Sequence, residues 1–537
     1  MTVQLLLAAI IMIACVICNL ISNRIGMPVL LAFILLGMFF GSDGVVKIYF
    51  DNYAFAEQIC SIALIFIMFY GGFGTKWNEA KPVAAKAILL SSLGTVTTAG
   101  LVGLFCWGIL KFSFLEGFLV GAVISSTDAA SVFSILRSKR LNLKYNTASL
   151  LEIESGSNDP FSYMLTVILL ALMNGDVSGP GFAYMIFAQI VYGVVFGFAI
   201  AMATRFVLKK VKISSSGFGA IFVVAVAVIS YATPSFLGGN GYLSAYITGI
   251  ILGNSKIDNK PELVHFFDGV TGLMQILLFF LLGLLSFPSQ LPNVALPALC
   301  IAVFLTFAAR PLAVFAILTP FRSPIRQKLL VSWAGMRGAA SIVFAIMAVI
   351  HPAVMSNDIF HMVFFIVLFS ILLQGTLIPP VARMLKMTDN ESNVMNTFND
   401  YMDEVPVRFI QLAIPENHSW VGKKVKEIQL PPDSLLVLIS RGEEKIVPNG
   451  QTVLCMGDSV ILSGKSPEKS QGLSLYEKKV GQGTEWCGKM ISEIHSGEER
   501  IILVRRGKKA VIPKGNTRLL ENDILVLTAK EQKISAG

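Results

Sequence analysis

Residues 149–163 read SLLEIESGSNDPFSY and place Glu152, Glu154, Asn158 and Asp159 within eight positions. The strongly apolar run LTVILLALM follows at 165–173. A charge at the centre of a bilayer costs at least ~2.5–3.5 kcal/mol even on lenient insertion scales, so it is kept only with a partner or a wet cavity. The stretch therefore predicts a membrane-crossing helix with a polar site at mid-depth.

The composition divides the chain into a membrane part and a soluble part. Of its 537 residues 54% are hydrophobic and 14% charged, and the mean hydropathy is +0.69, too apolar for a soluble globular chain. Residues 1–387 contain 23 of the 43 Lys and Arg and 14 of the 34 Asp and Glu, which leaves 20 of each sign for 388–537. We expect an all-α membrane domain at 1–387 and, after a linker at 388–405, small α+β domains at 406–470 and 471–537.

Thirteen apolar runs are long enough to approach the roughly 30 Å of a bilayer core. They lie near 3–22, 27–46, 53–73, 87–110, 115–136, 147–174, 181–204, 216–234, 241–254, 263–287, 292–319, 328–351 and 355–385. The first lacks a basic leader and is interpreted as a span, not as a signal peptide. Cys15 and Cys18 inside it are interpreted as small apolar side chains, not as a redox pair.

Loop charges orient these spans. With the N-terminus outside, the cytoplasmic side of the membrane part receives 19 Lys and Arg, and the outer side receives only Lys47 and Lys111. This asymmetry is the positive-inside pattern of membrane proteins. We therefore expect a multi-pass membrane protein with its N-terminus outside and its C-terminal domains in the cytoplasm.

Ionisable residues and small residues together predict a transport site. Six ionisable residues lie well inside the spans: Asp128, Glu152, Glu154, Asp159, Arg310 and Arg337. The fifth span contains GAVISSTDAASVF and the twelfth SWAGMRGAASIVF, two apolar helices interrupted by small and polar residues. Such a pair, one in each half of the chain, is typical of an inverted-repeat transporter with its site at mid-membrane.

Helical spacing assigns roles within the sixth span. Ser155 and Asp159 are four residues apart and share a face, and Glu154 and Asn158 share the neighbouring face. We interpret Asp159 as a carboxylate that binds either a proton or a monovalent cation, with neutral oxygens from Ser155 and the Thr127 region. A purely structural role for Asp159 is the alternative.

The remaining charges favour structural roles. We expect Glu154 to form an ion pair with Arg337, which would stabilise the fold. For Arg310 we expect either a stabilising pair or capping of the carbonyls of a broken helix. For Glu152, a structural role near the entrance of the helix and a functional role are both open.

The three motifs STDAAS, LLEIESGSNDPFSY and SWAGMRGAAS, in this order and spacing, resemble monovalent cation:proton antiporter family 1 over residues 1–387. The resemblance implies thirteen spans, two crossed unwound helices, a homodimer and an elevator-like motion. It makes Asp159 the carrier and Asn158 its neighbour, with Thr127 and Asp128 as the unwound-helix pair. It also implies electroneutral exchange, because the pair at 158–159 is Asn-Asp.

One departure from that family concerns the third span. It ends IMFYGGFG, where many relatives have an acidic residue near Tyr70 or Gly71. A possible ion ligand is therefore missing, and the relatives' ion preference does not transfer to this chain.

The C-terminal part contains an internal duplication. WVGKKVKEIQL at 420–430 repeats as WCGKMISEIHS at 486–496, and LLVLISRGEEKIVPNGQT at 435–452 repeats as IILVRRGKKAVIPKGNT at 501–517. Each copy predicts a short helix followed by strands that Gly and Pro-x-Gly turns separate. Two copies predict a paired module.

Each copy resembles the C-terminal subdomain of regulators of potassium conductance (RCK_C). The resemblance implies a small regulatory ligand at a dimer interface, in some proteins cyclic di-AMP, with Arg441, Arg505 and Arg506 as candidate phosphate contacts. A module that only dimerises the chain is the alternative. No G-x-G-x-x-G follows a strand, so NAD-type sensing is not expected.

The sequence thus predicts a secondary antiporter that exchanges cytoplasmic K⁺ for external H⁺ and is regulated by its tail. Exchange of Na⁺ for H⁺ on the same fold is the alternative. A ligand-gated cation channel, the other class considered, would need a T-V-G-Y-G-type filter, which the sequence lacks. We expect no enzymatic activity, no resident cofactor and no nucleic-acid partner.

Overall fold

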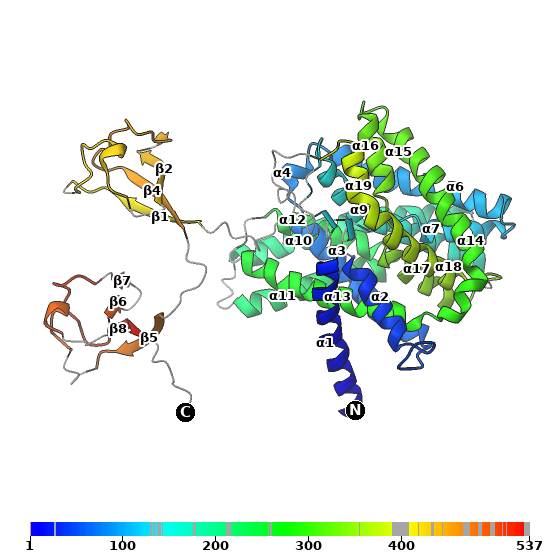
Figure 1. Ribbon diagram of the computed structural model, residues 1–537, viewed down its shortest axis with the longest axis horizontal. Coiled ribbons are helices and arrows are strands. Elements are labelled where there is room, and N and C mark those ends of the chain that lie inside the picture. The colour runs from blue at the N-terminus through cyan, green and yellow to red at the C-terminus, as the bar shows by residue number, and fades with distance from the viewer. Residues whose placement is uncertain are drawn as a thin grey trace. The chain divides into compact units, whose positions relative to one another are not determined.

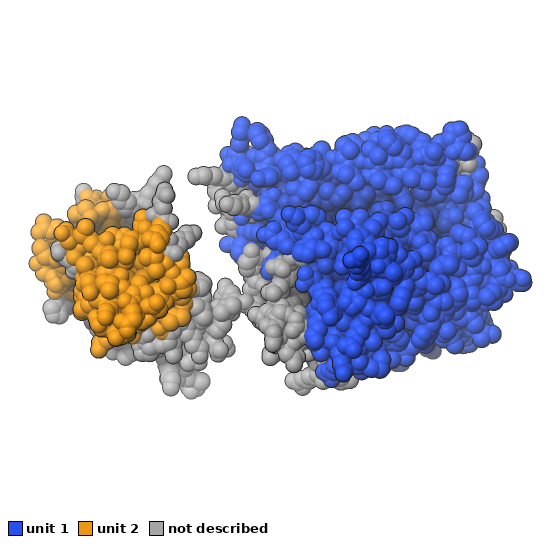
Figure 2. All heavy atoms as spheres, turned by 90° about the horizontal axis from the view of Figure 1, so that it is seen from above, with its two compact units in different colours: residues 1–402 blue, residues 403–537 orange. Residues whose placement is uncertain are grey.

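The structure, a computed structural model, describes residues 2–388 and 407–530, apart from residues 26–27, 129–130, 133–134, 137–140, 142, 176–178, 211–215, 256, 258–259, 354, 417, 431–433, 443, 466–472, 482–485, 495–499, 507–508 and 512. The chain divides into two compact units, residues 1–402 and 403–537 (Figure 2). The predicted linker at 388–405 lies outside the described residues except for Thr388.

Helices build the first unit (Figure 1). Its first half contains α1 (Thr2–Ile25), α2 (Val29–Phe40), α3 (Tyr53–Gly74), α4 (Trp77–Ala80), α5 (Ala84–Leu89), η1 (Leu90–Gly94), α6 (Thr95–Gly108), α7 (Phe114–Val123) and α9 (Thr147–Asn174). Its second half contains α10 (Gly179–Lys210), α11 (Ser216–Phe236), α12 (Gly241–Gly253), α13 (Lys260–Leu285), η2 (Pro288–Gln290), α14 (Leu291–Phe304), η3 (Leu305–Ala309), α15 (Arg310–Leu318), α16 (Ile325–Trp333), α17 (Ala339–Ile350), α18 (Ile359–Phe369), η4 (Ser370–Gly375) and α19 (Thr376–Met384).

The predicted spans coincide with these helices. Each of the thirteen ranges overlaps at least one helix of the first unit. Among the described residues, eight helical segments are long and apolar enough to cross a membrane, and α2, α7, α12 and α17 are shorter apolar helices. The hydropathy pattern thus located the helical segments correctly.

Two helices are interrupted where the sequence predicted it. Helix α7 ends at Val123, and residues 126–128 are not helical. Helix α16 ends at Trp333, and residues 335–338 separate it from α17. The two unwound segments touch, because the Asp128 backbone N–H donates to the Met336 carbonyl oxygen (2.8 Å).

Glycines let four helices pack backbone against backbone in two seams. Gly37 of α2 and Gly283 of α13 face each other, and a Cβ on either would collide with the backbone of the other helix. In the second seam Gly72 of α3 lies against the carbonyl of Tyr246, and Gly249 of α12 lies against the backbone of α3. The second and third predicted spans thus pack against the tenth and ninth.

Three of the long apolar segments contain a π-helical turn. The segment η1 joins α5 to α6, η3 joins α14 to α15, and η4 joins α18 to α19. A π-helical turn changes the rotation of all side chains beyond it and often occurs at functional sites. Because η3 ends directly before Arg310, it sets the direction in which that side chain leaves the helix.

The second unit contains two sheets of identical topology. Their strands are β1 (Val407–Ala413), β2 (Ser434–Arg441), β3 (Glu444–Ile446), β4 (Ser459–Lys465), β5 (Leu473–Lys479), β6 (Arg500–Arg506), β7 (Lys509–Val511) and β8 (Ile524–Lys530). The antiparallel orders are β1-β4-β2-β3 and β5-β8-β6-β7. The register shifts at equivalent points, Leu436/Leu438 and Ile501/Leu503, so the duplication in the sequence is a duplication in structure.

Candidate ion-binding site

The carboxylate-rich stretch lies on α9, a helix of 28 residues that continues through Pro160. Glu154 and Asn158 are fully buried, and Ser155 and Asp159 are 2% and 6% exposed. Buried polar groups are costly unless they are paired, so each needs a partner within the protein. Those partners come from the two unwound segments and from α15.

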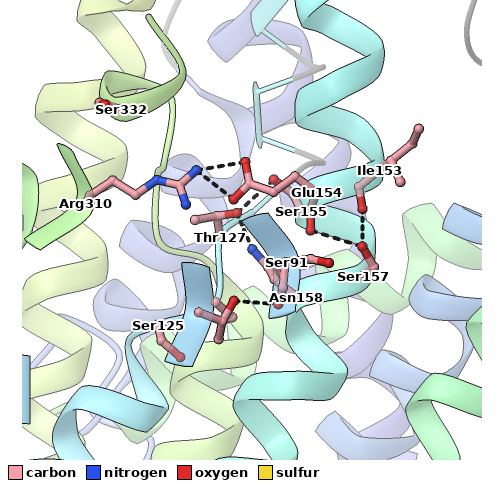
Figure 3. A network of polar contacts seen from close by, with 12 residues as sticks. Ser91, Ser125, Thr127, Ile153, Glu154, Ser155, Ser157, Asn158, Arg310 and Ser332 are labelled. Carbon is pink, nitrogen blue, oxygen red and sulfur yellow. Dashed lines mark hydrogen bonds and ion pairs between the residues drawn. The ribbon is translucent and has the colours of Figure 1, made fainter. Parts of the chain in front are cut away.

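Thr127 of the first unwound segment joins two of the α9 residues (Figure 3). The Asn158 Nδ2 group donates to Thr127 Oγ1 (2.5 Å), and the hydroxyls of Thr127 and Ser155 lie 2.9 Å apart. The structure therefore brings Thr127, Ser155 and Asn158 together into one cluster of neutral oxygen and amide groups.

The two aspartates lie next to this cluster. Asp128 is the last residue of the first unwound segment, and the Ser131 hydroxyl donates to Asp128 Oδ2 (2.5 Å). Asp159 interacts electrostatically with Asp128, and the Ser126 hydroxyl lies beside its carboxylate. Asp159 Oδ1 accepts no hydrogen bond within the described part of the chain. One buried oxygen of Asp159 is thus free to bind a proton or a cation.

The ion pair differs from the prediction. Glu154 pairs with Arg310, whose Nη2 lies 2.7 Å from Oε1 and 2.8 Å from Oε2. Arg337 instead donates from Nη1 to the carbonyl oxygens of Ser125 (2.8 Å) and Ser126 (2.7 Å). The predicted pair of Glu154 with Arg337 was therefore wrong. The reason is that the Arg310 side chain reaches Glu154 from α15, whereas the Arg337 side chain points to the free carbonyls of the other unwound segment.

Several residues that hold this arrangement were not predicted. The hydroxyls of Ser126 and Ser341 lie 3.1 Å apart and tie α17 to the first unwound segment. Ser370 Oγ accepts from the Arg337 backbone N–H (3.0 Å) and donates to Gln374. Serines in apolar helices commonly bond to their own helix, so their sequence gave no signal of these longer-range contacts.

The tail arginines form bonds within their own units. Arg441 donates to both carboxylate oxygens of Asp458 (2.8 and 2.9 Å), and Arg506 does the same to Asp523 (2.9 and 2.8 Å). These hydrogen bonds lower the pKa of the Asp458 and Asp523 carboxyls. Both arginines thus have structural partners, and the side chain of Arg505 lies outside the described residues.

The donor set determines the chemistry that this site can support. It offers two carboxylates and the hydroxyls of Ser155 and Thr127, all oxygen ligands, which suit hard cations rather than soft transition metals. Among the described residues no group of three or more His, Cys, Asp or Glu forms a metal-binding cluster. The arrangement fits weak, exchangeable binding of an alkali ion or a proton.

Crossed unwound helices around such a site define the class of cation:proton antiporters, which are transporters rather than enzymes. Residues 8–384 match the family described as sodium/hydrogen exchanger, transmembrane, and residues 409–468 and 475–536 each match a TrkA-C domain. The chain belongs to the sodium/hydrogen exchanger family and carries two TrkA-C domains.

Individual relatives agree with this assignment. The chain is 35% identical to the K(+)/H(+) antiporter NhaP of Alkalimonas amylolytica over 83% of this chain and 78% of that protein. It is 32% identical to the K(+)/H(+) antiporter NhaP2 of a Shewanella species (strain MR-4) over 84% and 79%. The sodium proton antiporter MjNhaP1 of Methanocaldococcus jannaschii shares the fold, with a TM-score of 0.62 at 23% identity over 71% of this chain and 99% of that chain.

Proposed function

We propose that the protein exports cytoplasmic K⁺ in exchange for external H⁺, one ion for one proton. Two relatives with 35% and 32% identity over most of the chain are named K(+)/H(+) antiporters. A tail of the kind found on potassium channels and transporters favours the same ion.

The observation that carries the proposal is the place of Asp159. Its carboxylate is buried at the crossing of the two unwound segments, beside the neutral oxygens of Thr127 and Ser155. A proton and a cation would compete for this single carboxylate. Either one neutralises it, so the occupied form can move through an apolar region where the empty, charged form cannot. Low cytoplasmic pH would therefore inhibit K⁺ export.

The other charges would stay fixed while Asp159 changes its partner. Glu154 and Arg310 neutralise each other. Arg337 has no carboxylate within ion-pair distance among the described residues and lies across the crossing from Asp128, so its charge would offset the charge of Asp128. Asn158 contributes no charge. With one exchangeable carboxylate, each cycle would move one positive charge in each direction.

Na⁺/H⁺ exchange is the second candidate. The shared fold of the sodium proton antiporter MjNhaP1 motivates it, although a likeness at 23% identity concerns the fold alone. Neutral oxygens next to one carboxylate would accept either alkali ion. The two candidates share the site and differ in the transported ion.

The proposed cell biology follows from charge and family. We place the protein in a bacterial plasma membrane as a homodimer, with the N-terminus outside and the tail in the cytoplasm, because positively charged loops favour the cytoplasmic side. The tail would bind a small regulatory ligand, with cyclic di-AMP as the candidate. Arg505 would be a candidate contact, whereas Arg441 and Arg506 would first have to leave their aspartates.

Ion flux in proteoliposomes tests the function. Vesicles with an imposed pH gradient receive K⁺, Na⁺ or Li⁺, and a pH-sensitive dye reports proton flux for wild type, Asp159→Asn and the control Asp51→Asn. Asp51 is exposed and lies far from α9 in the sequence. We expect K⁺-dependent flux that only Asp159→Asn abolishes. Proton flux with Na⁺ but not with K⁺ would show that Na⁺ is the transported ion. Flux that persists in Asp159→Asn would refute Asp159 as the binding site.

A further inference from the structure

Tyr246 is a buried residue of α12 that the site described above does not include. Its side chain is 4% exposed, and its hydroxyl forms no hydrogen bond within the described part of the chain. A buried hydroxyl without a partner loses the hydrogen bonds it had with water, so natural proteins rarely keep one without a reason. The surroundings of the Tyr246 hydroxyl indicate that reason.

The hydroxyl lies against α9 between two carboxylates. A Cβ on Gly156 would lie 3.0 Å from the Tyr246 hydroxyl oxygen, so the absence of a side chain at Gly156 leaves room for the Tyr246 ring. Glu152 precedes Gly156 by four residues and Asp159 follows it by three, which places all three on one face of α9. Both carboxylates interact electrostatically with the Tyr246 hydroxyl.

Thr75 does not satisfy this hydroxyl. Thr75 of the loop after α3 approaches Tyr246, but its own proton is donated to the Gly71 carbonyl oxygen (2.8 Å). The two hydroxyls do not meet in hydrogen-bonding geometry. The Tyr246 oxygen therefore keeps its lone pairs and its proton available toward α9.

The attachment of α12 fixes the position of this oxygen. Gly72 of α3 packs directly against the Tyr246 carbonyl, and Gly249 packs against α3 one turn later, so the backbone around Tyr246 is clamped. Contact with α9 is made by side chains instead, through the Tyr246 ring and through Asn240, whose Nδ2 donates to the Pro160 carbonyl oxygen (2.7 Å). Tyr246 thus presents a fixed oxygen to the helix that carries Asp159.

We propose that the Tyr246 hydroxyl is a further ligand of the transported cation, which it contacts as the cation passes between Glu152 and Asp159. This inference rests on the proposed function. The two carboxylates are seven residues apart, or about 10 Å along a helix, too far for an ion to contact both. A neutral phenol oxygen midway stabilises the ion while it passes from one carboxylate to the other. It does so without adding a negative charge that would bind the ion too tightly to be released.

The test removes only this oxygen. Tyr246→Phe keeps the ring and its packing, and Tyr192→Phe is the matched control, because Tyr192 of α10 bonds through its hydroxyl to Tyr184 (3.1 Å) away from α9. Proteoliposome flux gives KM and maximal rate for K⁺, and melting in detergent gives Tm. We expect Tyr246→Phe to raise KM about tenfold, the size of one lost contact to an ion, with little change in maximal rate. Its Tm should equal or exceed that of wild type.

Other results overturn the proposal. A KM within twofold of wild type would show that the hydroxyl does not contact the ion, and a lower Tm would assign it a structural role. A lower maximal rate at constant KM would also refute ion binding. Wild type and Asp159→Asn, measured in parallel, report separately on the proposed function. If the protein transports Na⁺ instead, the same comparison applies to the KM for Na⁺.

Discussion

Arg310 lies with one guanidinium nitrogen 2.7 and 2.8 Å from the two carboxylate oxygens of Glu154, and both side chains are at least 97% buried. This pair connects α15 to α9 directly beside Thr127, Ser155 and Asn158 (Figure 3). Arg337, also buried, holds the ends of the unwound backbone instead. The two arginines therefore stabilise the site by different means and should respond differently to substitution.

A double-mutant cycle distinguishes the role of Arg310 from that of Arg337. Glu154→Gln leaves the Arg310 charge buried without a partner and should destabilise the protein by about 3–5 kcal/mol, as when one member of a buried pair is removed. Adding Arg310→Met should recover most of that loss, whereas adding Arg337→Met should not. Thermal unfolding in detergent measures all the variants. A large coupling free energy between Glu154 and Arg337 would contradict the assignment.

Gly338 is needed for the approach of the two unwound segments. Its φ of −137° suits any residue, but a Cβ there would collide with the Asp128 side chain. Gly338→Ala should displace that carboxylate and lower exchange on the order of 100-fold, as misplacements of about 1 Å do in active sites. Gly100→Ala, in α6 with no atom within 4 Å of the added Cβ, is the matched control for flux measurements. Equal activity of the two variants would show that Asp128 is dispensable.

The missing acidic residue of the third span can be restored. A Cβ on Gly71 meets nothing within 4 Å, unlike one on Gly72, so substitution at this position of α3 causes no collision at the Cβ. Gly71→Glu should fold normally and raise the preference for Na⁺ over K⁺ about threefold or more, because a ligand set of higher field strength favours the smaller ion. Gly71→Gln tests size without charge. Competition between Na⁺ and K⁺ in proteoliposomes measures the preference, and identical behaviour of the two variants would exclude the charge effect.

The tail should lose stability in acid. Hydrogen bonds from Arg441 hold the pKa of Asp458 below its usual range, so the folded state favours the ionised carboxyl. This stabilisation is complete above the unfolded pKa of about 3.9 and disappears as the pH falls through the lower folded value. Asp458→Asn should cost about 2 kcal/mol at pH 7, less than a fully buried pair because Arg441 is 38% exposed, and less than that at pH 2, which lies below the unfolded pKa.

Pulsed hydrogen exchange along a urea gradient measures this effect. The full-length protein is equilibrated at each pH and labelled at a single fixed pH, and the protection of peptides from 434–465 is compared between wild type and Asp458→Asn. Peptides from 500–530 in the same sample are the internal control, since Asp523 keeps its partner Arg506. An equal difference between the variants at both pH values would contradict the linkage.

The sequence alone located the helices because membrane burial imposes long apolar runs, and each predicted span overlaps a helix. It also identified the two interrupted helices, since small and polar residues in such runs need a special reason. It could not choose the partner of Glu154. Arg310 and Arg337 are both buried cations, and only the placement of their side chains in three dimensions decides between them.

Other contacts were beyond sequence reasoning for similar physical reasons. The clamp of Ser126 with Ser341 joins residues 215 positions apart, and no periodicity links them. Tyr246 lies in an apolar helix as any core aromatic residue would, and its role depends on Gly156 of another helix. In the tail the repeated arginines suggested ligand contacts, but their spacing of 17 residues from Asp458 and Asp523 already matched in both copies.

Asn158 donates to Thr127 through a neutral amide, at a position where a second carboxylate could stand. This absence of a second charge has a consequence for the K⁺ balance of the whole cell. In the proposed one-for-one exchange the membrane voltage does no work, and transport stops only when the inner-to-outer ratio of K⁺ equals that of H⁺. A cell that concentrates K⁺ in a neutral medium is far from that balance. Such an exchanger would empty the cell of K⁺ and acidify it unless it is switched off. Under the proposed function, the two TrkA-C domains would therefore act as a brake, released when K⁺ is in excess or the cytoplasm is too alkaline.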